Sequence, residues 1–232
     1  MNKSTYFKTL TTAAALTLSA LLFNSCSKDP APTPEISYLS ITNASPTLNS
    51  YNIYVGSAKV NPAALGFTSV VPYGQYVPGT SAIKLTTGSS TESVFTKNVN
   101  LEANTIQSLF VIGKGATIDY LVVKDQLGSL TSDKAFVRFI NLSPDAAALN
   151  LTIKDGNTIV TDKAYKASSE FVELEAKAYV LQIKDKASGS DKGLTFNLDA
   201  KAGKSYTVMA VGMLNPASDT EQAFKGHVIN NQ

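Results

Sequence analysis

The feature that most constrains the fold of this chain is an internal repeat. Residues 38–46 (YLSITNASP) and residues 136–144 (FVRFINLSP) share an apolar pattern and an Asn-x-Ser-Pro ending at an offset of 98 residues. A repeat of this length indicates two copies of one structural unit. We therefore predict domains at residues 37–124 and 135–232, joined by the polar residues 125–134. Further matches at nearly the same offset are Asn52 with Asn150, Lys84 with Gln182, and Gly113 with Gly212.

Within each repeat the apolar residues alternate with polar ones. Residues 149–153 (LNLTI) show the alternation of a one-sided β-strand, and residues 154–157 (KDGN) have the composition of a tight hairpin turn. Roughly six to eight short strands per repeat predict an all-β fold: two tandem antiparallel β-sandwiches, immunoglobulin-like or transthyretin-like. Further strands are predicted at 169–174, 178–184, 193–198, 205–213 and 224–229.

One segment of the second repeat resembles a known family. Residues 141–145 (NLSPD), preceded by Val137-Arg138-Phe139 and followed by an alternating strand and an Asp-Gly turn, are similar to the domain-of-unknown-function family 4397. The second repeat resembles the family along most of its length, including residues 203–208 (GKSYTV). The first repeat departs from it at Thr47, which replaces the aspartate of the motif. The resemblance implies tandem, secreted or surface-anchored β-sandwich domains, and it implies no catalytic residues.

The N-terminal residues have the features of a bacterial export signal. Lys3 and Lys8 precede an apolar run from Leu10 to Phe23, which is shorter than the ~20 residues of a spanning helix. Cys26, the only cysteine, follows directly in a sequence similar to a relaxed lipobox. From this resemblance we predict that residues 1–25 are removed and that Cys26 is lipidated. Two acyl chains on Cys26 would anchor the protein stably in the membrane. An ordinary buried or free thiol is the alternative, and it fits this boundary position poorly.

A proline-rich tether is expected at residues 26–36. Pro30, Pro32 and Pro34 each remove a backbone donor and favour extended geometry in the preceding residue. At ~3.1 Å per residue, the tether would hold the first domain about 25–30 Å from the lipid surface. Ser27 after the acylated cysteine is similar to lipoproteins sorted to the outer membrane. We expect the protein in the outer membrane of a Gram-negative, Bacteroidota-like bacterium, facing the periplasm or the outside.

Charge and composition exclude several classes of partner. Removal of the signal leaves 207 residues, with 18 basic and 18 acidic side chains. This balance argues against nucleic acid as a partner, because such proteins need a basic surface. The chain is 44% hydrophobic and only 16% charged. This composition is typical of an extracytoplasmic β protein with real hydrophobic cores.

The chain lacks the residues for the common catalytic and metal sites. His227 is the only histidine and the single thiol is assigned to lipid, so zinc sites and Ser/His/Asp or Cys/His catalysis lack parts. The densest carboxylates are Glu170, Glu173 and Glu175. Glu173 and Glu175 share one face of a predicted strand, which is typical of a solvated edge and not of a glycosidase pair. We predict no enzymatic activity, no metal and no cofactor.

Tyrosines of the first repeat are the remaining candidates for a binding site. In residues 51–55 (YNIYV) the odd-numbered side chains are expected to face the core, so Asn52 and Tyr54 should point outward. Tyr73 lies where the second repeat has only small polar residues. A phenol offers an apolar face and one hydroxyl to a sugar or a peptide, so Asn52, Tyr54 and Tyr73 form the predicted ligand site. The alternative is scattered surface tyrosines without a function.

The sequence therefore predicts a non-catalytic binding or adhesion module for a glycan, a protein or an envelope component. The alternative is a structural spacer or accessory subunit of an envelope assembly that has no ligand of its own. The expected partners are the membrane, through the lipid anchor, and a glycan or envelope protein, without nucleic acid.

Overall fold

A computed structural model describes residues 34–231. The predicted signal peptide, Cys26 and most of the tether lie outside the described residues. Within this range every regular element is a strand except one short 3-10 turn, η1 (Gly115–Thr117). The all-β prediction is confirmed. No helix in residues 34–231 is long and apolar enough to cross a membrane.

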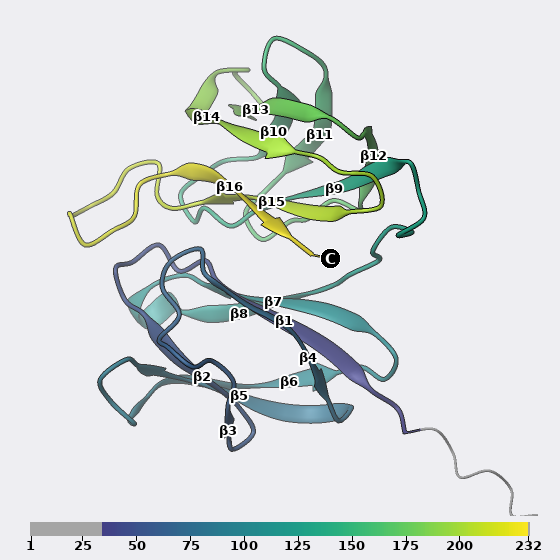
Figure 1. Cartoon of the computed structure of the whole chain (residues 1–232). Coiled ribbons are helices and arrows are strands. Elements are labelled where there is room, and N and C mark those ends of the chain that lie inside the picture. Colours follow the sequence, from purple (N-terminus) through teal and green to yellow (C-terminus); the bar gives the residue numbers. More distant parts are fainter. Residues whose placement is uncertain (1–33, 232) are drawn as a thin grey trace, which may run out of the picture. The chain divides into compact units, whose positions relative to one another are not determined.

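The first repeat forms a sandwich of two four-stranded sheets (Figure 1). The order is β4-β1-β7-β8 in one sheet, named inner sheet 1 here, and β3-β2-β5-β6 in the other, named outer sheet 1. Its strands are β1 (Ser37–Asn43), β2 (Tyr51–Val55), β3 (Ala58–Lys59), β4 (Val70–Tyr76), β5 (Gly79–Thr87), β6 (Ser93–Leu101), β7 (Ile106–Ile112) and β8 (Asp119–Lys124).

The second repeat forms the same sandwich with the same strand order. Inner sheet 2 is β12-β9-β15-β16 and outer sheet 2 is β11-β10-β13-β14, so each strand corresponds to the strand eight numbers earlier. The predicted hairpin at residues 154–157 is present, with Asp155 at a φ of 56°. The strands are β9 (Lys134–Asn141), β10 (Leu149–Ile153), β11 (Thr158–Lys163), β12 (Val172–Glu175), β13 (Ala178–Asp185), β14 (Asp191–Asp199), β15 (Ser205–Val211) and β16 (Lys225–Asn230).

Each sandwich contains one parallel strand pair among its antiparallel ones. β1 pairs with β7 in parallel, and β9 pairs with β15 in parallel. A parallel pair needs a long crossover, and here the chain passes through the whole outer sheet between the two strands. The prediction of β-sandwiches is confirmed. The sheets are not purely antiparallel as expected, because each inner sheet contains one parallel pair.

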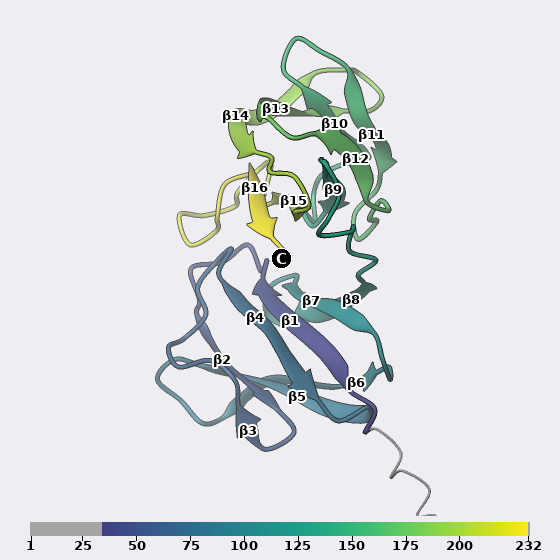
Figure 2. The same cartoon turned by 45° about the vertical axis from the view of Figure 1, so that its right-hand side comes forward.

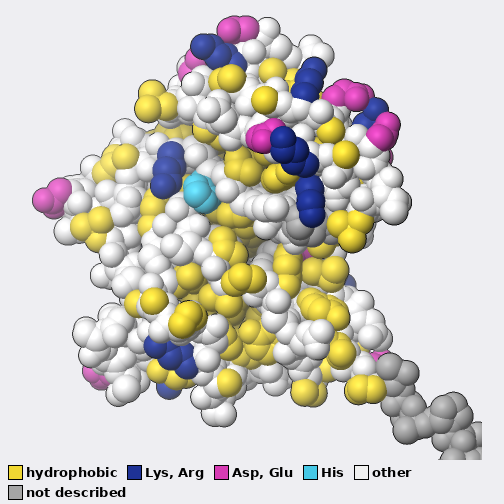
Figure 3. Space-filling view, viewed as in Figure 1, with side chains coloured by type: hydrophobic (Ala, Val, Ile, Leu, Met, Phe, Trp, Pro, Cys, Tyr) yellow, Lys and Arg dark blue, Asp and Glu magenta, His cyan; other side chains and the backbone are white. Residues whose placement is uncertain are grey.

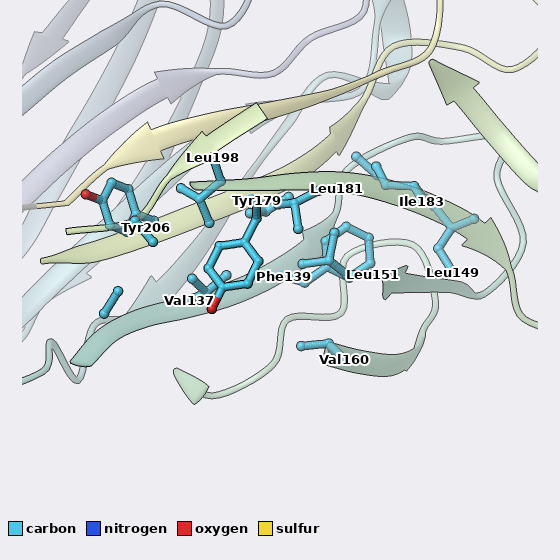
Figure 4. Close-up of a cluster of buried hydrophobic side chains, with 14 of the residues drawn as sticks. Val137, Phe139, Leu149, Leu151, Val160, Tyr179, Leu181, Ile183, Leu198 and Tyr206 are labelled. Atoms are coloured by element: carbon cyan, nitrogen blue, oxygen red, sulfur yellow. The ribbon is translucent and has the colours of Figure 1, made fainter. Parts of the chain in front are cut away.

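Alternating side chains fill the core between the two sheets of each sandwich. In the first core, Ile41 of β1 packs with Ile53 of β2 and Leu85 of β5, all fully buried. Figure 4 shows the equivalent core of the second sandwich, where Phe139 and Leu151 lie between the sheets. The predicted core face of residues 51–55 is confirmed, because Tyr51, Ile53 and Val55 all belong to the first core.

A third apolar cluster joins the outward faces of the two inner sheets. Phe110 of β7 packs in it with Ile140 of β9 and Met209 of β15. Residues Glu35–Gln232 consequently form one compact unit by their contacts. β8 ends at Lys124 and β9 begins at Lys134. Independent folding of residues 37–124 and 135–232 stays a prediction.

The repeated Asn-x-Ser-Pro motif closes each sandwich in the same way. The Asn43 side-chain oxygen accepts the N–H of Ser45 at 3.1 Å, and its amide donates to the carbonyl of Leu65 at 2.9 Å. Asn141 accepts the N–H of Ser143 at 3.1 Å and donates to Lys163 at 3.0 Å. Both amide oxygens accept buried serine N–H groups that no strand partner reaches, so the motif has a structural role. The serine hydroxyls donate to the carbonyls of Gly113 and Gly212, each at 2.7 Å.

Candidate functional site

The structure places Tyr73 half-buried, with its hydroxyl between the two inner sheets. Its hydroxyl donates to the Asp125 carboxylate at 2.6 Å and accepts from the Asn231 amide at 2.9 Å. Burial first, and then the negative charge of Asp125, raises the pKa of Tyr73 to about 12. The expectation that Tyr73 is an exposed ligand contact is wrong. The sequence argument took the outward face of β4 as solvated, whereas the second sandwich covers it.

The hydrogen bonds of Tyr73 belong to a larger buried polar network. Arg138 of β9 is 1% exposed and forms an ion pair with Asp125, whose side chain is fully buried. The guanidinium also donates to Thr207 at 2.7 Å and to Ser108 at 3.2 Å. Both charges are therefore paired and hydrogen-bonded, which a buried ion pair requires. This network links the inner sheets and occupies the Tyr73 hydroxyl with hydrogen bonds inside the protein.

Asn52 and Tyr54 lie on the outer face of outer sheet 1, as the alternation predicts. Asn52 is nevertheless only 8% exposed, and its amide donates to the carbonyl of Thr87 at 3.1 Å. The ammonium of Lys84 stands 4.4 Å from the centre of the Tyr54 ring. The core of the first sandwich separates this face from Tyr73. Asn52, Tyr54 and Tyr73 therefore do not form one exposed site, and that expectation is corrected.

A groove of about 370 Å³ opens along one side of the first sandwich instead. Its walls are β6 and β8, the outermost strands of outer sheet 1 and inner sheet 1, which both lie toward the right in Figure 2. Because no strand joins these two edges, the side of the sandwich stays open between them. The lining residues are Lys97, Asn98, Val99, Asn100, Glu102, Gln107, Tyr120, Val122 and Lys124.

Two ion pairs cross the groove, one at each end of β8. Lys97 of β6 bonds to Asp119 at 2.8 Å, and Lys124 bonds to Glu102 at 2.6 Å. The rise of β8 separates the two pairs by about 16 Å. Between them lies the ring of Tyr120, 6% exposed, whose pKa is raised by burial first and by the charge of Asp119 second. The groove thus has an apolar middle and charged ends.

The second sandwich has aromatic rings at two of the matching positions. Lys97 pairs with Ile83 of β5, and Phe196 of β14 pairs with Leu181, which lies 98 residues after Ile83. Phe196 therefore stands where the first sandwich has Lys97. Its ring packs directly on Gly226, so that any Cβ there would clash with it.

A second pair of matching positions lies on β7 and β15, the strands next to β8 and β16. Gln107 of β7 pairs with Lys124, and Tyr206 of β15 pairs with Asn230 in the same place. Tyr206 is 7% exposed and belongs to the second core.

Gly226 stands where the first sandwich has Tyr120, because Tyr120 pairs with Val111 as Gly226 pairs with Ala210. The Phe196 ring, which lies on Gly226, therefore takes the place of the Tyr120 ring, and the two openings differ mainly in charge.

A wider depression of about 430 Å³ lies on the second sandwich, between β11 and β12. It is lined by aliphatic residues such as Ile159 and Val172 and by polar ones such as Lys163 and Glu170, and no aromatic ring contributes to it. In residues 34–231 no group of three or more His, Cys, Asp or Glu side chains is placed to hold a metal ion. His227, the single cyan side chain of Figure 3, is half-buried on β16. The groove between β6 and β8 is therefore the better-defined candidate.

Sequence reasoning missed this groove, although one signal was available. Residues 93–101 (SVFTKNVNL) alternate as a strand, and Lys97 falls on the face of Phe95, Val99 and the core. A lysine at a core-facing position of a strand indicates that the core is open there, because a buried charge without compensation is costly. The matching Phe196 makes the same point by comparison.

Fold and groove together define an all-β protein of two sandwiches, with a groove between the edge strands of the first. The sequence profile of a family described as Domain of unknown function (DUF4397) matches residues 37–152, half of the chain, and the chain belongs to this family. The match begins at β1 and ends within β10, so it continues past the first sandwich. The predicted family is confirmed, although the matched range excludes most of the second repeat.

Comparisons with solved structures and with curated proteins do not extend this family assignment. One similar solved structure is CBMbc, a family CBM26 module from Eubacterium rectale Amy13K in complex with maltoheptaose. It is 8% identical, covers 80% of this chain and 100% of its own, and has a TM-score of 0.26, which does not establish a common fold. A search of curated proteins found no match.

Proposed function

We propose that the protein is a non-catalytic binding module of a bacterial envelope, anchored through lipidated Cys26, and that the groove between β6 and β8 holds its ligand. The observation that carries the proposal is the charged groove of the first sandwich, where Lys97 and Lys124 stand at the positions of Phe196 and Asn230 in the second. The two sandwiches share a backbone plan, so a difference at one opening points to a role that the fold does not require.

The chemistry of the groove favours binding over catalysis. Its two nearest carboxylates, Asp119 and Glu102, belong to ion pairs at opposite ends of β8. A glycosidase pair needs two carboxyl groups within roughly 5–9.5 Å, facing one substrate bond. Lys97 and Lys124 instead offer charged donors to an extended, polar ligand, and Tyr120 offers an apolar floor.

The test is a variant that replaces one charge of the groove by the residue of the second sandwich. Lys97→Phe introduces the residue found at the matching position, and Tyr54→Ala is the control on the outer face of the same sandwich. Binding would be measured on a glycan array and on an array of overlapping peptides from envelope proteins. Binding that Lys97→Phe abolishes and Tyr54→Ala preserves supports the proposal. Failure of the wild type on both arrays favours a spacer.

A spacer or accessory subunit is the second candidate, favoured by the buried Arg138–Asp125 pair. A ligand-binding role for the groove requires no ordered contact between the sandwiches, whereas a spacer requires a fixed one. Small-angle scattering of the wild type and Arg138→Met would show whether the network fixes the arrangement. A spacer also predicts that Lys97→Phe retains full biological function.

The lipid anchor is tested separately. Cys26→Ser is expected to move the protein from the membrane fraction to the soluble fraction, or to leave the precursor unprocessed. Metabolic labelling with a fatty-acid analogue in the native host measures acylation directly. An unlabelled wild-type protein would remove the anchor from the proposal and leave the groove untouched.

A further inference from the structure

The wall of the groove formed by β6 presents backbone groups that β5 does not use. The carbonyl of Ala82 in β5 accepts the N–H of Gly56 at 2.8 Å, so the backbone of Ala82 faces β2. Asn98 is the partner of Ala82 in the antiparallel ladder. In such a ladder the N–H and C=O of one residue point the same way, so those of Asn98 point away from β5.

The same direction repeats at every second residue of β6. Thr96, Asn98 and Asn100 share it, and all three have exposed side chains. The carbonyl of Asn100 accepts the side-chain amide of Gln107 at 3.3 Å, which shows independently that it faces the groove. The edge thus offers donor and acceptor groups about 6.6–6.8 Å apart along the strand.

We propose that the groove binds an extended peptide segment of a partner protein, which adds to β6 as a further strand of outer sheet 1. This inference rests on the proposed function. An extended peptide is the ligand class whose own N–H and C=O groups recur at the spacing of Thr96 and Asn98. A glycan has no such repeat of alternating backbone donors and acceptors.

The groove then accepts alternate side chains of the added strand. Val122 and the edge of Tyr120 form the apolar middle, and the ion pairs of Lys97 and Lys124 form its ends. A peptide fits this groove if it has an apolar residue in the middle and charged residues several positions away on both sides. The strand supplies the affinity through its backbone, and the groove selects the side chains.

The other long edge, β14, carries features that prevent strand addition. Gly193 has a φ of 68°, and the ladder with β13 shifts register between Leu181 and Ile183. Such bulges twist an edge away from new partners. β6 has no glycine or proline, and its one register shift lies at its beginning, at Ser93.

Lys97 narrows the choice of partner further. An inward-pointing charge on an edge strand discourages pairing with another copy of the same strand, because two lysines would be brought into one groove. A partner peptide with an acidic or polar side chain at that place has no such penalty. We therefore commit to a foreign peptide as the occupant and not to a second copy of the chain.

The experiment removes one backbone donor from β6. Full-length wild-type protein would be used to select from a phage-displayed library of random twelve-residue peptides, and the selected peptide would then be synthesised. Asn98→Pro deletes the groove-facing N–H, which an edge strand tolerates, and Asn98→Ala keeps it. Affinity should fall about tenfold for Asn98→Pro and less than about twofold for Asn98→Ala.

A second measurement keeps the wild-type protein and changes the peptide. N-methylation of single peptide residues should alternate between strong and weak loss of binding with a period of two, because only every second peptide N–H faces β6. Uniform or absent effects overturn strand addition. This readout does not depend on the folding of Asn98→Pro.

The remaining outcomes separate this inference from the proposed function. Glycan binding that Lys97→Phe abolishes and Asn98→Pro leaves intact keeps the groove and overturns the peptide. No binding of either probe overturns both. Self-association in sedimentation experiments that Asn98→Pro abolishes assigns the edge to a second copy, and so also overturns a foreign peptide.

Discussion

The two sandwiches share their strand order and their Asn-x-Ser-Pro closures but differ in the side chains at one opening. Lys97 and Gln107 in the first stand where Phe196 and Tyr206 stand in the second. The shared residues satisfy buried backbone groups, so any copy of the fold needs them. The differing residues leave the strand order unchanged and decide whether this side is lined by charged or by aromatic side chains. The comparison therefore separates what builds the sandwich from what is available for binding.

The inner sheets show a second difference between the copies. Arg138 of β9 pairs with Thr207, and its counterpart Ser40 of β1 pairs with Ser108. The first sandwich thus brings a small hydroxyl to the shared interface and the second brings a guanidinium. A symmetric pair of arginines would leave two charges for the single carboxylate of Asp125. The two copies have become complementary where they meet.

The largest expected effect comes from breaking this complementarity. Arg138→Met leaves the Asp125 carboxylate buried without a counter-ion, which should lower the free energy of unfolding by roughly 3–5 kcal/mol. Ser40→Ala, at the matching position, should change it by less than about 1 kcal/mol. Urea unfolding followed by circular dichroism measures both. The double variant Arg138→Met with Asp125→Leu should recover most of the loss, and an Arg138→Met protein as stable as the wild type would show that the pair is hydrated.

Matched core truncations test whether the copies unfold together. Ile53→Ala and Leu151→Ala each delete a fully buried side chain from one of the two cores, at an expected cost of about 2–5 kcal/mol. If Glu35–Gln232 is also one cooperative unit, either variant should shift a single calorimetric transition. Two transitions, of which each variant moves only one, would instead show independently folding domains, as the repeat predicts.

The Asn-x-Ser-Pro amides should be equivalent in the two copies. Asn43→Ala and Asn141→Ala each leave a buried serine N–H without its acceptor and remove a hydrogen bond to a carbonyl, for an expected loss of about 1–3 kcal/mol. Thermal unfolding of the two single variants provides the comparison. A large loss in one copy with none in the other would contradict a common structural role for the motif.

Sequence reasoning found the repeat, the strands and the core faces because these follow from the period-two pattern of each copy alone. Several strands predicted in the second repeat differ from the observed bounds by one or two residues, as at Ala178–Asp185. The placement of Tyr73 failed because it depends on the other sandwich, which no local pattern reports. The groove was missed for a related reason: Lys97 is informative only when its pairing with Ile83 is known. The fold could therefore be predicted from the local alternation of apolar and polar residues. The site could not, because it depends on which residues of distant strands are paired.

The smallest expected effect is a pH dependence confined to the second copy. His227 of β16 pairs with Met209, and its counterpart Leu121 of β8 pairs with Phe110. Burial first, and then the charge of Lys225, lowers the pKa of His227 below its usual value of about 6.5. The unfolded chain therefore takes up this proton at a higher pH than the folded protein does. Stability should fall as the pH decreases from about 6.5 to the lower native pKa, and it should stay level below that value.

The half-exposed position of His227 limits this loss to below about 1 kcal/mol. His227→Leu introduces the residue of the first copy and should remove the slope between pH 7 and 5, while His227→Gln should remove it without adding apolar contact. Thermal midpoints across this pH range measure the effect. An unchanged slope in both variants would assign it to carboxylates, whose protonation begins at the acidic end of the same window.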